Sequence, residues 1–340
     1  MDISVIGRIQ ESLVEKRRNL LGWLEASPAS EKRVHLGNEE GTSVQPHLQV
    51  LENCLEEVED PSFGICNVCH TQIDTELIEM DYTAAVCLGC MSEEEREKLQ
   101  LELDFMQTVH RAFLPSEMPS IPGLDIAAFS RPAQSSGGDY FDFFQFSDGA
   151  NGLAVADAMG HGLSASLLMS NLQAAFRTLV PLSNSPAEVL QRLNQFYLHN
   201  IHFTTFATAF MARLTPGSLR LDYSNAGQNP PLLVRQGNGS PRWLAPTGAA
   251  VGVIEDYQIH SESVELAEGD VLVVYTDGVV EANNPQGEEF GNQRLAELVQ
   301  ENVSQPVHDM VSILRRGLQA FVAEAPIEDD VTFLAFKVTG

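Results

Sequence analysis

The spacing of apolar residues divides the chain into two regions that meet near residue 119. In the first region, apolar residues recur every three or four positions within 3–25, 46–59 and 92–113, which predicts three amphipathic helices. The polar, turn-rich segment 26–44 separates the first two, so the pattern predicts an antiparallel helical hairpin. The third helix has an apolar seam typical of a short coiled coil or of a helix docked on the next domain: Leu99, Leu103, Met106, His110 and Phe113.

After residue 119 the pattern changes to short apolar runs bounded by turn residues, with two pairs of helical stretches. We predict strands at 126–129, 140–146, 152–156, 205–214, 219–224, 231–235, 258–266, 271–275 and 331–338, and helices at 162–180, 185–200, 292–300 and 306–322. Strands grouped around two pairs of helices favour an α+β layered sandwich over alternating βαβ units.

Four of the five cysteines form two C-x2-C pairs, Cys66 with Cys69 and Cys87 with Cys90, separated by seventeen residues. Two such pairs supply the four thiolates that tetrahedral zinc prefers. Because cysteine fills all four positions, the predicted site is closed, and its zinc would be structural rather than catalytic. Cysteine pairs of this kind also indicate a reducing compartment rather than a disulfide framework.

The balance of charge narrows the possible partners. Apolar residues make up 44% of the 340-residue chain, as in ordinary globular proteins, but the formal net charge is -27. This charge disfavours binding to nucleic acid and to anionic membranes. No apolar run approaches the ~18 residues of a membrane span, and the first residues lack a signal-peptide pattern. We therefore expect a cytoplasmic protein with no membrane contact.

Acidic residues lie at the ends of four predicted strands. They are Asp139 in SSGGDYFD, Asp157 in ADAMGHG, Asp277 in YTDG, and the pair Asp329 and Asp330 before the last strand. A single Asp-Gly pair is usually a turn, but four such positions without clustered His or Cys favour a site for Mg2+ or Mn2+. Four carboxylates can hold two divalent cations about 3.5–4 Å apart. The pattern alone leaves open a phosphatase, a nuclease or another two-metal hydrolase.

Six motifs in the second region occur in a characteristic order: SSGGDYFDFF, VADAMGHG, YSNAGQNPPLLV, GDVLVVYTDGVVEANN, EEFGNQRL and EDDVTFLAFKV. Together they resemble the SpoIIE/RsbU branch of the metal-dependent protein phosphatases (PPM, or protein phosphatase 2C-like). The resemblance implies an α+β fold, an αββα sandwich over 119–340. It also implies a serine/threonine phosphatase in which two Mg2+ or Mn2+ ions activate a water molecule that attacks phosphorus directly.

The same resemblance assigns metal ligands, which are carboxylates and one backbone carbonyl: Asp139, Asp157, Ala158, Asp277 and Asp329, with Asp330 as the alternative to Asp329. Asp157 would bridge both ions and Asp139 would hold the second, so both are assigned to catalysis. His161 would position or protonate the leaving serine oxygen, or else only fill a Gly-His-Gly turn. The loop around Asn225 resembles the family's asparagine-glycine-histidine-asparagine loop, with Gln228 where histidine is common.

The segment 46–91 resembles the DksA/TraR-type four-cysteine zinc finger in its Phe-Gly-Ile-Cys entry and its seventeen-residue gap. In that family a helical hairpin packed on the finger inserts into RNA polymerase through acidic residues at its tip. Here the tip region, 31–40, lacks a distinctive Asp motif, and we interpret the finger as a module for protein contact or sensing. The predicted organisation is a regulatory hairpin with a zinc finger (1–91), a linker helix (92–118) and a phosphatase domain (119–340).

These features predict a two-metal protein phosphatase under the control of a zinc module. By resemblance, its substrate would be a phosphorylated STAS-domain anti-anti-sigma factor in a bacterial partner-switching pathway, and the linker helix would form a homodimer. The alternative is a regulatory protein that binds a partner such as RNA polymerase through its finger, with the phosphatase-like domain as a scaffold.

Overall fold

The computed structural model describes residues 63–74, 77–78, 84–160, 162–200, 206–215, 217–237, 240–255 and 258–339, with the single residues Val14, Glu52 and Leu55. The chain forms two compact units, Met1–Glu102 and Leu103–Gly340. The predicted helices at 3–25 and 46–59, with the hairpin tip between them, lie almost entirely outside the described residues. The boundaries predicted at 91 and 118 stay predictions.

Helix α5 (Glu93–Phe113) agrees with the helix predicted over 92–113. Its first turn is closed by reciprocal hydrogen bonds: the Ser92 hydroxyl accepts from the Glu95 N–H at 3.3 Å, and the Glu95 carboxylate accepts from the Ser92 N–H at 2.9 Å. Three glutamates in this turn also favour the positive end of the helix dipole. His110 is the one buried side chain of α5.

The unit Leu103–Gly340 contains two five-stranded sheets. The first has the order β1 (Leu124–Arg131), β10 (Val331–Val338), β9 (Val271–Tyr275), β6 (Leu232–Val234) and β7 (Arg242–Trp243). The second has the order β2 (Asp139–Gln145), β3 (Asn151–Ala158), β4 (Ala207–Leu214), β5 (Arg220–Ala226) and β8 (Glu262–Glu265). Every pairing in both sheets is antiparallel.

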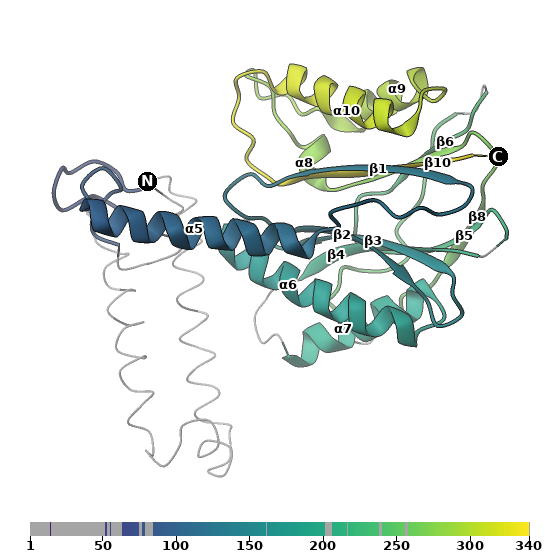
Figure 1. Ribbon diagram of the computed structural model, residues 1–340, viewed down its shortest axis with the longest axis horizontal. Helices are drawn as coiled ribbons and strands as arrows, with labels where there is room; N and C mark the ends of the chain where they lie inside the picture. The colour runs from purple at the N-terminus through teal and green to yellow at the C-terminus, as the bar shows by residue number, and fades with distance from the viewer. Residues whose placement is uncertain are drawn as a thin grey trace, which may run out of the picture. The chain divides into compact units, whose positions relative to one another are not determined.

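A pair of helices covers the outer face of each sheet (Figure 1). Helices α9 (Gly291–Glu301) and α10 (Val307–Val322) pack on the first sheet, and α6 (Gly162–Leu179) and α7 (Pro186–Asn200) pack on the second. A third core, which includes Phe141, Phe210 and Phe336, fills the space between the sheets. The predicted α+β fold with an αββα sandwich is therefore confirmed.

Three short elements are absent from the sequence prediction. Strand β7 has two residues, the 3-10 helix η1 (Val180–Leu182) has three, and α8 (Asp277–Val280) has four and follows β9 after a single residue. Elements of this length carry no recognisable period of apolar residues. Among the described helices, none combines the length and the apolar character needed to cross a membrane.

Candidate active site and metal-binding centres

Asp139 and Asp157 face each other across two neighbouring strands. Asp139 begins β2, Asp157 is the penultimate residue of β3, and the antiparallel register pairs them directly. Asp139 is buried, and one of its carboxylate oxygens accepts a hydrogen bond from the Thr276 hydroxyl at 2.8 Å. Because Thr276 immediately precedes Asp277, this bond connects the β2 end of one sheet with the β9 end of the other.

Asp330 holds the glycine-rich loop before β2 against the start of β10. Its two carboxylate oxygens accept hydrogen bonds from the N–H groups of Ala133 and Gly138, at 2.8 and 2.6 Å. The close approach requires glycine: a Cβ atom at Gly137 would overlap the Asp330 carboxylate, and one at Gly138 would lie 2.6 Å from the Ala158 carbonyl oxygen. The Gly-Gly pair therefore brings Asp330 and the Ala158 carbonyl next to the loop that carries Asp139.

Asp277 and Asp329 are half-buried and make short local contacts. Asp277 accepts a hydrogen bond from the Gly278 N–H at 2.9 Å, and Asp329 accepts one from the Asp330 N–H at 2.8 Å. In the described part of the chain, no arginine or lysine forms an ion pair with either carboxylate. Asp157 is also half-buried, so three carboxylates remain partly open to solvent while Asp139 and Asp330 do not.

These carboxyl groups raise one another's pKa values. Burial raises the pKa of Asp157, and the negative charges of Asp277, Asp329 and Asp330 raise it further. Burial, followed by the charge of Asp157, raises the pKa of Asp139. The pKa of Asp329 rises to about 6, first through burial and then through neighbouring carboxylates that include Asp277. Mutual repulsion of this kind is what a bound divalent cation would relieve, so the donor set fits Mg2+ or Mn2+.

Two residues support this loop although the sequence did not single them out for that purpose. His110 on α5 places its Nε2 atom 3.1 Å from the Gly137 carbonyl oxygen and 3.3 Å from the Gly137 nitrogen, and burial lowers its pKa. Depending on the tautomer, Nε2 of His110 donates to the Gly137 carbonyl or accepts from the Gly137 N–H. From α6, the Ser166 hydroxyl also donates to the Gly137 carbonyl at 3.1 Å. The predicted seam contained His110, but nothing local in the sequence marks Gly137 as its partner.

Gln228 occupies the position where the family loop commonly has histidine, and its side chain holds two strands together. Its side chain is buried, donates to the Tyr275 carbonyl at 3.0 Å and is hydrogen-bonded to the Thr208 hydroxyl. It therefore joins β4 to the end of β9, two residues before Asp277. An amide suits this position because it donates and accepts at the same time. The other sequence candidate, His161, lies outside the described residues.

The four cysteines of the N-terminal unit lie together. Their sulfur atoms all fall within 4.8 Å of one another, the only such group of three or more His, Cys, Asp or Glu side chains among the described residues. Backbone N–H groups of Cys69 and Cys87 lower the pKa of Cys66 to about 6, whereas the neighbouring thiols, Cys69 first, raise that of Cys90 to about 12. Four thiolates at this spacing need a cation, and the set fits tetrahedral zinc.

The αββα sandwich formed by these two sheets and their helices is the fold of PP2C-type phosphatase domains. Residues 147–339 match the family described as Stage II sporulation protein E (SpoIIE). The chain belongs to the SpoIIE family.

Individual relatives agree with this assignment. The chain is 27% identical over 242 residues to the phosphoserine phosphatase RsbU of Bacillus subtilis, which is 71% of each protein. It is 30% identical to the RsbU and RsbW domains of Rv1364c from Mycobacterium tuberculosis, with a TM-score of 0.57, covering 67% of this chain and 63% of that one. The SiaA-PP2C domain of Pseudomonas aeruginosa, at 23% identity, has the same fold; its TM-score is 0.63, and 73% of this chain and 99% of that one are covered.

Proposed function

We propose that this PP2C-type serine phosphatase hydrolyses phosphoserine or phosphothreonine on a protein, with two divalent cations held by the carboxylate cluster. The observation that carries the proposal is the convergence of Asp139, Asp157, Asp277 and Asp329 from four chain segments onto one end of the sandwich. When bound, Mg2+ or Mn2+ would lower the pKa of a water molecule and neutralise charge on the phosphoryl group.

The contacts of the two adjacent acids support Asp329 over Asp330 as the ligand. Both oxygens of Asp330 already accept backbone N–H groups in a buried position, which suits a carboxylate that shapes the loop. Asp329 is half-buried and interacts electrostatically with Asp277 and Asp157. Asp139, Asp157, Asp277 and the Ala158 carbonyl would supply the remaining protein oxygens. Asp139 is oriented by Thr276, and Asp330 holds the loop in place.

The proposed activity is tested by phosphate release from phosphoserine, phosphothreonine and phosphotyrosine peptides in Mn2+, in Mg2+ and with a chelator. Release from the first two peptides that depends on added metal supports the phosphatase. Metal binding to the domain without turnover of any peptide would favour the scaffold hypothesis instead.

A STAS-domain phosphoprotein is the proposed physiological substrate, and kinship with RsbU supports it. Helix α5 is the proposed dimer contact. Leu101 and Phe105 lie one turn apart on this helix and are 70% and 69% exposed, which suits packing against a second helix.

Metal binding is expected to stabilise the protein more at pH 7.5 than at pH 5. A carboxyl whose folded pKa exceeds its unfolded value favours the protonated folded state, so its contribution to stability is present below about pH 4 and is lost as pH rises towards the folded pKa. For Asp329 that loss ends near its pKa of about 6. Near-saturating Mn2+ should reverse the loss and raise the Tm by about 5–10 °C at pH 7.5. At pH 5, proton competition should shrink the shift, and equal shifts at both pH values would contradict the assignment.

The cysteine cluster is proposed to bind one structural zinc ion. Cys87→Ser should lower the zinc content of the purified protein from about one ion to near zero, because three thiolates hold zinc far more weakly than four. Hydrolysis of p-nitrophenyl phosphate should persist, since the cysteines belong to the other compact unit. The matched control is Cys54→Ser, which changes the one cysteine outside both C-x2-C pairs. Full zinc content in Cys87→Ser would refute the site.

A further inference from the structure

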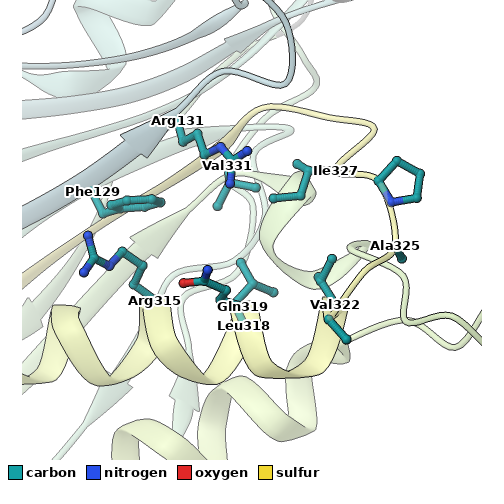
Figure 2. Close-up of a pocket in the computed structure, with 11 residues that line it drawn as sticks. Phe129, Arg131, Arg315, Leu318, Gln319, Val322, Ala325, Ile327 and Val331 are labelled. Atoms are coloured by element: carbon teal, nitrogen blue, oxygen red, sulfur yellow. The ribbon is translucent and has the colours of Figure 1, made fainter.

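A cavity of about 530 Å3 lies between the C-terminal half of α10, the end of β1 and the loop that leads into β10. Figure 2 shows Gln319 and Val322 entering from α10, Ile327 from the loop, and Phe129 and Arg131 from β1. Eight of the eleven lining residues are apolar, and the polar side chains among them are two guanidinium groups and one amide. This composition is typical of a site that orients a ligand by charge and holds it by apolar contact.

A second hollow lies next to this cavity along α10, and we call the two together the groove. The second hollow, of about 310 Å3, shares Phe129 and Arg315 with the first and reaches Met118 and His308. The stretch of α10 from His308 to Val322 spans roughly 21 Å at the rise of an α-helix. In the described part of the sheet, β1 pairs only with β10, so the groove runs beside an edge strand. Its length suits an extended polypeptide segment better than a compact small molecule.

Two arginines line this groove: Arg131 at the end near the loop into β10, and Arg315 where the two hollows meet. Neither Arg131 nor Arg315 forms an ion pair within the described residues, and Arg315 lies 5.8 Å from the centre of the Phe129 ring. The opposite end carries Asp125, 3.9 Å from His308. In a chain of net charge -27, two arginines without acidic partners are the complement of a negatively charged ligand.

The Arg131 end of the groove is connected to the candidate metal ligands along the chain. Ile327 and Val331 line the cavity, and the residues between them include Asp329 and Asp330. Arg131 pairs with Val331 in the sheet register, and the N–H of Ala133, two residues further on, binds Asp330. A segment held in the groove would therefore emerge beside the candidate active site.

We propose that the groove binds an acidic, leucine-type apolar segment that flanks the phosphorylated residue of the substrate protein. This inference rests on the proposed function and adds a specificity determinant to it. Because both the enzyme and a phosphoprotein carry negative charge, a local cationic subsite offsets the long-range repulsion. Arg131 and Arg315 would bind the acidic side chains, and the half-buried apolar side chains of Phe129 and Ile327 would contact the leucines.

The test compares two phosphoserine peptides, one flanked on both sides by Glu-Leu repeats and one in which Gln replaces each Glu. For the unmodified protein in Mn2+, we expect a KM roughly five- to ten-fold lower for the Glu peptide, with similar kcat. In R131Q/R315Q this preference should vanish, while hydrolysis of p-nitrophenyl phosphate stays unchanged. The matched control R192Q/R235Q removes two exposed arginines elsewhere and should keep the preference.

The outcomes separate the two levels of inference. Absence of turnover for p-nitrophenyl phosphate and for both peptides would sink the proposed function itself. Turnover of both peptides with equal KM in the unmodified protein, or a preference that survives in R131Q/R315Q, would overturn only the groove. Loss of the preference in R192Q/R235Q would mean that the lower KM arises from the net charge of the protein, and it would likewise contradict binding in the groove. The comparison of peptides on the unmodified protein does not depend on any variant folding.

Discussion

Replacing Asp157 with asparagine is expected to reduce phosphatase activity by at least about 1000-fold at saturating Mn2+. Asp157 faces Asp139 across the β2–β3 pair and is close enough to Asp277 and Asp329 for their charges to raise its pKa. Asparagine keeps the size of the side chain but removes the negative charge that would hold the cations. A lost contribution of several kcal/mol to the barrier corresponds to this factor. Turnover of p-nitrophenyl phosphate over a range of Mn2+ concentrations measures it.

The same substitution should leave the fold intact and stabilise the metal-free protein, because it removes one of several mutually repelling charges; the Tm in chelator should not fall. Asp148→Asn is the matched control. Asp148 lies in the turn between β2 and β3, at the opposite end of both strands, and pairs with Arg213. The Asp148→Asn variant should retain activity. Normal turnover in Asp157→Asn would remove Asp157 from the catalytic machinery.

Alanine at Gly278 is expected to lower both activity and stability. A Cβ atom there would overlap the backbone oxygen of Asp330. The backbone cannot relieve such an overlap by a rotamer change, as the end of a flexible side chain can. The start of β10 would have to shift, which moves Asp329 away from Asp277. Overpacking of this kind costs roughly 1–3 kcal/mol. We expect a Tm lower by several degrees and a loss of activity of at least about ten-fold, measured by thermal unfolding and by turnover.

Gly317→Ala is the control for this effect. On α10, the added Cβ atom meets only the end of the Leu298 side chain, which is flexible. Alanine in a helix interior is favoured over glycine by roughly 0.5–1 kcal/mol, so stability should hold or rise and activity should be unchanged. If Gly278→Ala behaved like Gly317→Ala, the tight contact with Asp330 would not be what positions Asp329.

The strand ends that carry the carboxylates were predictable because each aspartate stands where an apolar run gives way to glycine or to a second acid. The different hydrogen-bond partners of Asp329 and Asp330 could not be predicted in this way. The backbone groups that bind Asp330 belong to Ala133 and Gly138, 197 and 192 residues away, and no local pattern encodes such a pairing. The contact of His110 with Gly137 could not be predicted for the same reason. The sequence identified Gln228 as a departure from the family motif, but only the folded structure reveals its hydrogen bond to the Tyr275 carbonyl.

The pairing of β1 with β10 has a consequence for synthesis of the protein. Strand β10, which follows Asp329 and Asp330, is the last strand described along the chain, yet it lies in the interior of the first sheet between β1 and β9. Until β10 has been synthesised, β1 has no partner in this sheet, and the proposed metal site lacks Asp329. Such long-range closure is slow compared with local folding. We therefore expect phosphatase activity only after β10 has been synthesised, and fragments that end before β10 should be inactive.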